Sequence, residues 1–423
     1  MFEIQPNKIH ERALLIGLEK DGVSKWDLRD SMEELRELAN SAGAEVVDTV
    51  TQKLQKPTAP YYIGRGKAEL IRESIQDRRV TSVIFDDELS PAQGRNLENL
   101  LARKVLDRTQ LILDIFAQRA RSREGRLQIE LAQLQYLLPR LTRMWHHLSR
   151  QTGGIGTRGP GETQLEVDRR RVQERIARLE RELVAVRKTR AVQRQGRKRH
   201  QWPVAAVVGY TNAGKSTLLN RLTGADLIAV DQLFATLDPT TRSFVLANKQ
   251  RLLLTDTVGF LRKLPHTLIE SFKATLEEVH EADLLIHVVD LSHARVDEQM
   301  EAVDGVIKEL DAYGKQTLIV FNKIDNLSNR ELATSYTQRF PGSVAISART
   351  GEGLPHLVQA LQDALASWRL RSHYKIPANE SALIAEIHRV GHVLELRYDG
   401  NDAIITAHVP PQLQHRLSRF AVT

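Results

Sequence analysis

Hydrophobic and polar positions in the first hundred residues follow two different periods. Apolar residues recur at helical spacing at Met32, Leu35 and Leu38, and again across residues 68–75. Apolar runs of strand length alternate with these helical patterns and lie at residues 13–18, 44–48 and 81–86. Strands that alternate with helices predict a small α/β domain with a partly parallel sheet over residues 1–108.

The middle of the chain has a heptad pattern instead. Apolar residues step by four and three positions through Leu127, Leu131, Leu134, Leu138, Leu141, Trp145 and Leu148. After a glycine-rich stretch the pattern resumes, broken only by Arg169, at Leu165, Val172, Ile176, Leu179, Leu183 and Val186. Two heptad helices joined by a short loop predict an antiparallel helical hairpin, a coiled coil, over residues 109–197 with its tip at residues 151–161.

Two further segments complete a multidomain α/β protein. Residues 198–370 are expected to form a second α/β domain, with buried-strand runs at 204–208, 252–255, 318–321 and 343–346. Residues 371–423 are expected to form a small α+β domain. Its clearest feature is a β-hairpin of residues 392–398 and 403–407, with a turn at Asp399-Gly400-Asn401.

Composition narrows the class of protein. The 423 residues are 41% hydrophobic and 27% charged, which is typical of a soluble globular protein. The sequence has no long apolar run that predicts a membrane span, and its start has no export-signal pattern. It has no cysteine, which excludes disulfides and thiolate metal sites. We therefore expect a cytoplasmic protein, acting as a monomer.

Charge is distributed unevenly along the chain. Residues 101–200 contain 24 Lys and Arg against 10 Asp and Glu, a net charge of +14, whereas the whole chain carries +7. Such asymmetry favours contact with a nucleic acid, although a solvated arginine-rich helix face is the simpler alternative. Glycine backbone at the hairpin tip could approach phosphates or bases closely. A flexible connector remains the alternative for these candidate RNA-binding residues: Arg150, Gly153, Gly154, Gly156, Thr157, Arg158 and Gly159.

A phosphate-binding loop separates the strand at 204–208 from a helix pattern. The run Gly209-Tyr210-Thr211-Asn212-Ala213-Gly214-Lys215-Ser216 matches G-x-x-x-x-G-K-[ST] in the required strand–loop–helix context. Backbone N–H groups of the loop would surround phosphates, and the helix N-terminus would add its positive dipole. Lys215 would neutralise β- and γ-phosphate oxygens, and Ser216 would bind Mg²⁺. The loop therefore predicts a nucleotide site with Mg²⁺ as cofactor.

Three more motifs follow strands in the same domain. In Asp256-Thr257-Val258-Gly259, Asp256 is expected to hold the Mg²⁺ shell, and the Gly259 N–H to meet the γ-phosphate. Asn322-Lys323-Ile324-Asp325 resembles the NKxD element of small GTPases, whose aspartate accepts two hydrogen bonds from guanine. Ser347-Ala348-Arg349 resembles the guanine loop of the same proteins. Ligands of open α/β sheets bind at the carboxyl ends of strands, so the four motifs together predict a GTP site.

Switch I is expected between Ser216 and Asp256. The segment Phe234-Ala235-Thr236-Leu237-Asp238-Pro239-Thr240-Thr241-Arg242 fills this interval, and its first five residues are predicted to contact GTP. One threonine should complete the Mg²⁺ shell when GTP is bound. By resemblance to related translational GTPases this is Thr236, with Thr240 and Thr241 as alternatives.

The catalytic group is open. The predicted catalytic residues are Lys215, Thr236, Asp256, Gly259 and Asn212. Many GTPases place a glutamine directly after the glycine of DxxG to orient the attacking water, but Phe260 stands there. Intrinsic hydrolysis should therefore be slow, or another group must serve. Asn212 resembles the asparagine of potassium-stimulated GTPases, which suggests K⁺ as a second cofactor.

Several segments together resemble the HflX family of P-loop GTPases. The most specific is Gly153-Gly154-Ile155-Gly156-Thr157-Arg158-Gly159-Pro160-Gly161-Glu162, and the segments at residues 61–67 and 86–91 are similar to that family's N-terminal domain. The resemblance implies GTP-dependent binding of the large ribosomal subunit and splitting or rescue of stalled ribosomes, particularly under heat stress. It places the hairpin tip against rRNA near the peptidyl-transferase region.

Two other functions stay open. The resemblance also implies ATP use and RNA unwinding by the N-terminal part, so an ATP-driven RNA helicase with added ATPase activity is one alternative. The motif Gly64-Arg65-Gly66-Lys67 is too short for a second P-loop, and we interpret it as a strand-to-helix turn. The other alternative is a regulator that uses GTP only to switch its binding to a protein complex. The charge asymmetry favours the RNA functions over this one.

Overall fold

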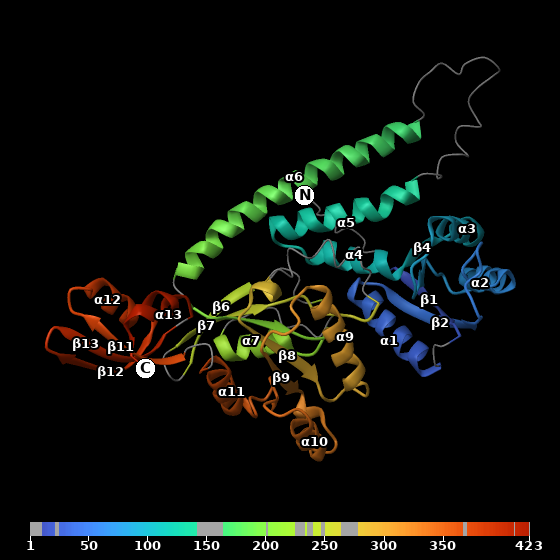
Figure 1. The fold of residues 1–423 in the computed structure, drawn as a ribbon. Helices are drawn as coiled ribbons and strands as arrows, with labels where there is room; N and C mark the ends of the chain where they lie inside the picture. The colour runs from blue at the N-terminus through green and yellow to red at the C-terminus, as the bar shows by residue number, and fades with distance from the viewer. Residues whose placement is uncertain are drawn as a thin grey trace, which may run out of the picture. The chain divides into compact units, whose positions relative to one another are not determined.

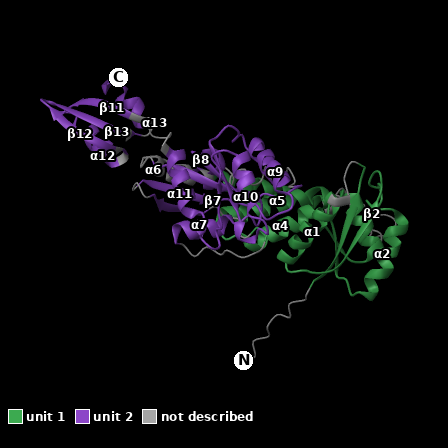
Figure 2. Ribbon diagram, turned by 90° about the horizontal axis from the view of Figure 1, so that it is seen from below, with its two compact units in different colours: residues 1–185, 232–234, 264–272 green, residues 186–231, 235–263, 273–423 purple. Residues whose placement is uncertain are grey.

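The computed structural model describes residues 11–21, 25–141, 164–199, 202–224, 233–234, 240–246, 250–263, 278–366, 370–409 and 411–422. Figure 1 shows the fold of the chain, and Figure 2 colours its two compact units separately. Unit 1 comprises residues 1–185, 232–234 and 264–272, and unit 2 comprises residues 186–231, 235–263 and 273–423. The predicted division into four segments is finer than this grouping and stays a prediction.

Unit 1 begins with a four-stranded, all-parallel sheet in the order β2-β1-β3-β4. Its elements are β1 (Arg12–Glu19), α1 (Lys25–Ser41), β2 (Glu45–Lys53), α2 (Arg65–Asp77), β3 (Ser82–Phe85), α3 (Pro91–Leu101), β4 (Lys104–Asp107) and α4 (Arg108–Arg119). The three predicted strands are present, whereas β4 was not predicted. Apolar residues of β1 and β3 pack with those of α2 and α3 in one buried cluster. The predicted α/β fold of this part is confirmed.

The motif at residues 64–67 begins a helix, as predicted. Gly64 is the N-cap of α2, and its N–H donates to the Gln52 side chain at 2.9 Å. This donor therefore already has a partner within the protein. The interpretation as a strand-to-helix turn is consistent with this geometry.

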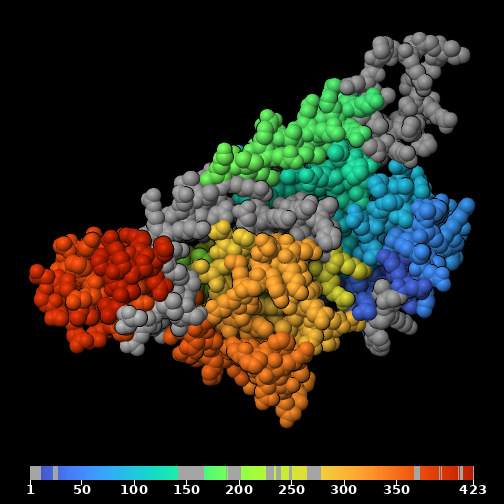
Figure 3. Space-filling model, viewed as in Figure 1, coloured from blue at the N-terminus to red at the C-terminus, as the bar shows by residue number. Residues whose placement is uncertain are grey.

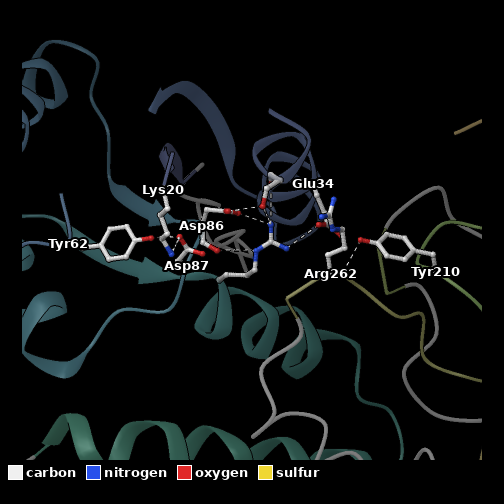
Figure 4. A network of polar contacts seen from close by, with 9 residues as sticks. Lys20, Glu34, Tyr62, Asp86, Asp87, Tyr210 and Arg262 are labelled. Carbon is white, nitrogen blue, oxygen red and sulfur yellow. Dashed lines mark hydrogen bonds and ion pairs between the residues drawn. The ribbon is translucent and has the colours of Figure 1, made fainter. Parts of the chain in front are cut away.

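Buried charges lie at the carboxyl edge of this sheet. Arg108, 2% exposed, contacts Asp86 at 2.7 Å and Glu34 at 3.2 Å. Next to them, Lys20 and Tyr62 are both directed at Asp87 (Figure 4). Burial, followed by the charge of Asp87, raises the pKa of Tyr62 above its usual range. Each carboxylate of this network has a cationic partner, as buried charges in a stable core require. We therefore interpret the network as part of the structural core of the domain.

Two long helices follow and form the helical arm. α5 (Arg123–Leu141) and α6 (Gln164–Arg199) lie side by side (Figures 1 and 3), and Arg175 makes a two-bond contact with Glu130 across them at 2.7 and 2.9 Å. Heptad positions are buried on both helices, at Leu127, Leu131, Leu179 and Leu183. Trp145, Leu148 and the tip at 151–161 lie outside the described residues.

Unit 2 contains the expected second α/β fold. Its six-stranded sheet has the order β10-β9-β8-β5-β7-β6, with only β6 antiparallel to its neighbour. The elements are β5 (Val204–Val208), α7 (Lys215–Thr223), β6 (Thr240–Val245), β7 (Arg251–Asp256), β8 (Leu284–Asp290), α9 (Val296–Glu309), β9 (Thr317–Asn322), η1 (Ile324–Asn326), α10 (Glu331–Arg339), β10 (Val344–Ala345) and α11 (Leu354–Ala366). Because β5 is central, the loop that follows it lies at the middle of the sheet's carboxyl edge.

The C-terminal part is a small α+β fold, as predicted. Four strands have the order β12-β13-β11-β14 and bury one apolar face against two helices. The elements are β11 (Leu370–Pro377), α12 (Ser381–Val390), β12 (His392–Asp399), β13 (Asp402–Val409), α13 (Pro411–Leu417), η2 (Ser418–Phe420) and β14 (Ala421–Val422). The predicted hairpin is present, because β12 and β13 pair antiparallel up to Asp399 and Asp402. No helix among the described residues is long and apolar enough to cross a membrane.

Candidate functional site

The phosphate-binding loop occupies the expected turn between β5 and α7. Gly209 and Gly214 have φ angles of 149° and 92°, a region that side-chain-bearing residues rarely adopt. A Cβ on Gly209 would lie 2.2 Å from the Val288 carbonyl oxygen, and one on Gly214 would lie 2.3 Å from the Asn322 amide nitrogen. Only glycine fits at both positions, so the motif's two glycines are required by the loop's own geometry.

Lys215 is held within this loop. Its Nζ donates to the carbonyl oxygens of Gly209 at 3.1 Å and Tyr210 at 2.6 Å. Burial lowers the pKa of Lys215 to about 8, while Asp256 acts in the opposite direction and Lys323 adds to the lowering. An anion at the loop would stabilise the charged ammonium. The Lys215 side chain therefore lies where a phosphate is expected, and a bound phosphate would stabilise its charged form.

Ser216 and Asp256 form an oxygen-donor pair beside Lys215. The Ser216 hydroxyl donates to Asp256 Oδ2 at 2.7 Å, and Asp256 is fully buried at the end of β7. The adjacent Thr257 hydroxyl donates to the Val207 carbonyl at 2.7 Å, which ties this strand end to β5. Hydroxyl and carboxylate oxygens that leave positions for water and phosphate match the preference of Mg²⁺. These residues fit the predicted metal role.

The DxxG segment is joined to the phosphate-binding loop by backbone bonds. Phe260 donates to the Gly209 carbonyl at 3.1 Å and accepts from the Thr211 N–H at 2.8 Å. A Cβ on Gly259 would come within 2.9 Å of both Thr211 and Lys215 Nζ, so a side chain there would collide with the loop. The Phe260 ring is 2% exposed. The ring is therefore part of the hydrophobic core, at the position where many other GTPases have a glutamine.

Asn322 connects the two halves of the predicted nucleotide site. Its Nδ2 donates to the Ala213 carbonyl at 2.8 Å, and its Oδ1 accepts from the Ala348 N–H at 2.9 Å. The side chain therefore bridges the phosphate-binding loop and the predicted guanine loop. Asp325 lies in η1, three residues further on, and is partly exposed. An accessible carboxylate next to a rigid bridge can accept hydrogen bonds from a base.

Other contacts of the site were not predicted from the sequence. Lys323 has a φ of 65° and pairs with Asp290 at 2.7 Å. The Tyr210 hydroxyl accepts from the backbone N–H of Arg262 at 2.9 Å (Figure 4). The position of Asp290 at the end of the apolar run of β8 was a usable signal, because the other site residues also follow strands. Nothing local in the sequence indicates the bond to Tyr210.

Several predicted site residues cannot be placed. Ala235, Thr236, Leu237 and Asp238 lie outside the described residues, as do the RNA-binding candidates Arg150, Gly153, Gly154, Gly156, Thr157, Arg158 and Gly159. Their roles stay predictions. Phe234 is described, and its ring packs against Phe116 of α4 with a centroid distance of 4.6 Å. Ile324 and Ala348 are buried, whereas Arg349, the last residue of the predicted guanine loop, is exposed.

Comparisons with known proteins cover nearly the whole chain. Family models described as GTP-binding GTPase N-terminal, GTP-binding GTPase middle region and 50S ribosome-binding GTPase match residues 29–117, 119–197 and 204–323. A protein named GTPase HflX from Caldanaerobacter subterraneus is 46% identical over 413 residues, 98% of this chain and 94% of that protein. GTPase HflX of Escherichia coli is 48% identical over 365 residues, 86% of this chain and 85% of that protein. A solved GTP-binding protein from Sulfolobus solfataricus, in complex with GDP, is 25% identical over 84% of this chain and 99% of its own, with a TM-score of 0.45.

Proposed function

Because the chain belongs to the HflX family of GTPases, we propose that it binds the large ribosomal subunit in its GTP form and splits or rescues stalled ribosomes. Heat and other stress are the proposed conditions. One observation supports the proposal above the others. The same chain has a nucleotide site whose loops are already held in place by Lys215 and Asn322, and a helical arm that is rich in arginine. The match of residues 204–323 to a 50S ribosome-binding GTPase model supports the choice of partner.

The proposed mechanism is a nucleotide switch. Lys215, which lies within the phosphate-binding loop, would bind the β- and γ-phosphates. Ser216 and Asp256, which contact each other, would hold Mg²⁺, and the ion would neutralise phosphate charge. GTP orders Thr236 and the Gly259 N–H around the γ-phosphate, and hydrolysis releases both. A ligand shifts a conformational equilibrium only by its differential affinity for the two states. The GTP and GDP forms must therefore differ in affinity for the ribosome.

The helical arm is the proposed rRNA contact. Arg169, Arg170, Arg171, Arg178 and Arg181 of α6 are exposed. Some of them have carboxylate neighbours on the same helix, but residues 101–200 as a whole keep a net charge of +14. Clustered arginines of one sign are suited to a phosphate backbone. The proposed contact extends to the glycine-rich tip, near the peptidyl-transferase region.

Hydrolysis needs a group that Phe260 cannot supply. The ring is buried and has no polar atom with which to orient water. We propose that the ribosome supplies or orders the missing group, and that K⁺ held with the help of Asn212 contributes. Asn212 is exposed in the phosphate-binding loop, with a φ of 60°. Hydrolysis rates in KCl and NaCl at matched ionic strength test the potassium role, which equal rates would exclude.

An additional ATPase in the N-terminal domain has less support. The Gly64 N–H is bonded within the protein, and the comparisons name GTP-binding regions. The distinguishing substitution is Asp325→Ala, which removes the proposed guanine acceptor. RNA unwinding driven by ATP that survives this change would favour the helicase alternative.

The test of the proposed function is fractionation of ribosomes on sucrose gradients. Purified 70S particles are incubated with the protein and either GDP or a non-hydrolysable GTP analogue. The proposal predicts loss of 70S, with protein migrating with 50S, only with the analogue. An Asp325→Ala variant should lose this effect, whereas Asp363→Ala, which removes an exposed carboxylate of α11 outside the predicted site, is the matched control for surface charge. Intact 70S under both conditions would contradict the proposal.

A further inference from the structure

Thr211 of the phosphate-binding loop has a buried hydroxyl that forms no hydrogen bond with the described part of the chain. The residue is 6% exposed, and its Oγ1 is closed to solvent and has no partner among the described residues. Buried polar side-chain atoms of folded proteins are nearly all hydrogen-bonded, because burying an unpaired hydroxyl costs free energy. A ligand that supplies the missing acceptor would remove this cost.

Three other polar side chains of the loop have partners within the protein. Lys215 and Ser216 donate to oxygens of the loop and of β7. The Tyr210 hydroxyl accepts from a backbone N–H at 2.9 Å (Figure 4). The backbone of Thr211 is also bonded, because its N–H donates to the Phe260 carbonyl at 2.8 Å. Thr211 is therefore fixed in place, while its hydroxyl stays available to a ligand.

The Thr211 side chain lies against Gly259. A Cβ on Gly259 would lie 2.8 Å from both the Cα and the Cγ2 of Thr211, and 2.9 Å from Lys215 Nζ. The three residues follow β5 and β7, which are neighbours in the sheet (Figure 1). The Gly259 N–H and the Lys215 ammonium are both expected to contact the γ-phosphate. The Thr211 side chain therefore belongs to the group of atoms that would surround this phosphate.

We propose that the Thr211 hydroxyl donates a hydrogen bond to a γ-phosphate oxygen of bound GTP, and that this bond helps the protein to distinguish GTP from GDP. This inference rests on the proposed nucleotide switch and deepens it. A hydroxyl has one proton to donate, and a hydrogen bond to a charged acceptor is stronger than one between neutral groups. GDP has no γ-phosphate, so the hydroxyl stays without this acceptor in the GDP form.

This contact supplies part of the differential affinity that a nucleotide switch requires. Thr211 keeps its proton in the proposed role, so it binds the γ-phosphate and does not act as a base. The attacking water must still be oriented by another group, because the buried Phe260 ring has no polar atom. The proposal therefore assigns Thr211 to recognition of the γ-phosphate and leaves the need for a further catalytic group unchanged.

The test compares the affinities for a non-hydrolysable GTP analogue and for GDP, with the full-length protein and no ribosomes. Thr211→Val removes the hydroxyl at nearly constant shape and should weaken binding of the analogue by about tenfold, with GDP affinity unchanged. Thr211→Ser keeps the hydroxyl and should retain most of the preference for the analogue. Thr223→Val is the matched control, since the Thr223 hydroxyl donates to the Leu219 carbonyl at 2.8 Å at the other end of α7. It should alter neither affinity.

Urea unfolding of the nucleotide-free protein provides a second readout. Because the hydroxyl has no partner among the described residues, Thr211→Val should not lower the urea midpoint. A lower midpoint would assign the hydroxyl to a structural bond and overturn the proposal, as would an unchanged affinity for the analogue or equal losses for both nucleotides. Wild-type protein that bound neither nucleotide would instead refute the nucleotide site itself. Because no ribosome is present, failure of the proposed ribosome function would leave these outcomes unchanged.

Discussion

Removal of the Asn322 side chain should damage both stability and nucleotide binding. Asn322→Ala deletes two hydrogen bonds, to the Ala213 carbonyl at 2.8 Å and from the Ala348 N–H at 2.9 Å. Both partners are buried, at 0% and 3% exposed. A buried polar group that loses its partner costs about 1–3 kcal/mol, so the free energy of unfolding should fall by roughly 2–4 kcal/mol.

Nucleotide affinity should fall for a separate reason. Asn322 bridges the phosphate-binding loop and the predicted guanine loop. Without this bridge the two loops would have to be ordered when the ligand binds, which costs affinity. We expect GDP affinity to fall by about tenfold or more, which corresponds to about 1.4 kcal/mol.

Urea unfolding and titration with a fluorescent GDP derivative measure the two effects. Asn326→Ala is the matched control, because Asn326 lies four residues away at the exposed end of η1. It should leave both quantities within error of the wild type. The reasoning would be refuted if Asn322→Ala unfolded at the wild-type urea concentration and bound GDP with wild-type affinity.

Three further predictions concern charge. Phosphate binding should require the protonated form of Lys215, whose pKa is lowered to about 8. GTP affinity should therefore be constant below about pH 8 and fall as the pH rises through about 8 to 9. Calorimetric titration of GTP across this range measures the profile, and a flat profile would mean that Lys215 has no role. Arg108→Met removes the guanidinium that lies 2.7 Å from the buried Asp86 carboxylate. The free energy of unfolding of unit 1, measured by urea denaturation, should fall by about 3–5 kcal/mol. An unchanged free energy of unfolding would mean that the pair is not buried in solution. Arg169→Gln combined with Arg181→Gln should weaken 50S binding and reduce its salt dependence by about one to two units of slope, and an unchanged slope would place the rRNA contact elsewhere.

Local patterns were sufficient to predict much of the fold. Apolar runs located β1, β5, β7 and β9, because fully buried parallel strands are continuous in their hydrophobicity. The four-residue β4 was missed, since Lys104–Asp107 is too short to show a period. It becomes a strand by pairing with β3, a contact that no local pattern contains.

The site divides in the same way. The conformation of the phosphate-binding loop was predictable, because backbone geometry requires its two glycines, and Lys215 lies within the loop as expected. The burial of Phe260 could not be predicted, although the sequence shows directly that this position holds no glutamine. The Phe116–Phe234 pair joins residues more than a hundred positions apart, so only the tertiary structure could reveal it.

The most direct test of the account is the affinity of the protein for purified 50S subunits in its two nucleotide states. Co-sedimentation over a range of 50S concentrations, with GDP or a non-hydrolysable GTP analogue, gives both dissociation constants. The account predicts clearly tighter binding with the analogue, because only differential affinity allows GTP to drive docking and hydrolysis to drive release. Equal dissociation constants in the two states would contradict it.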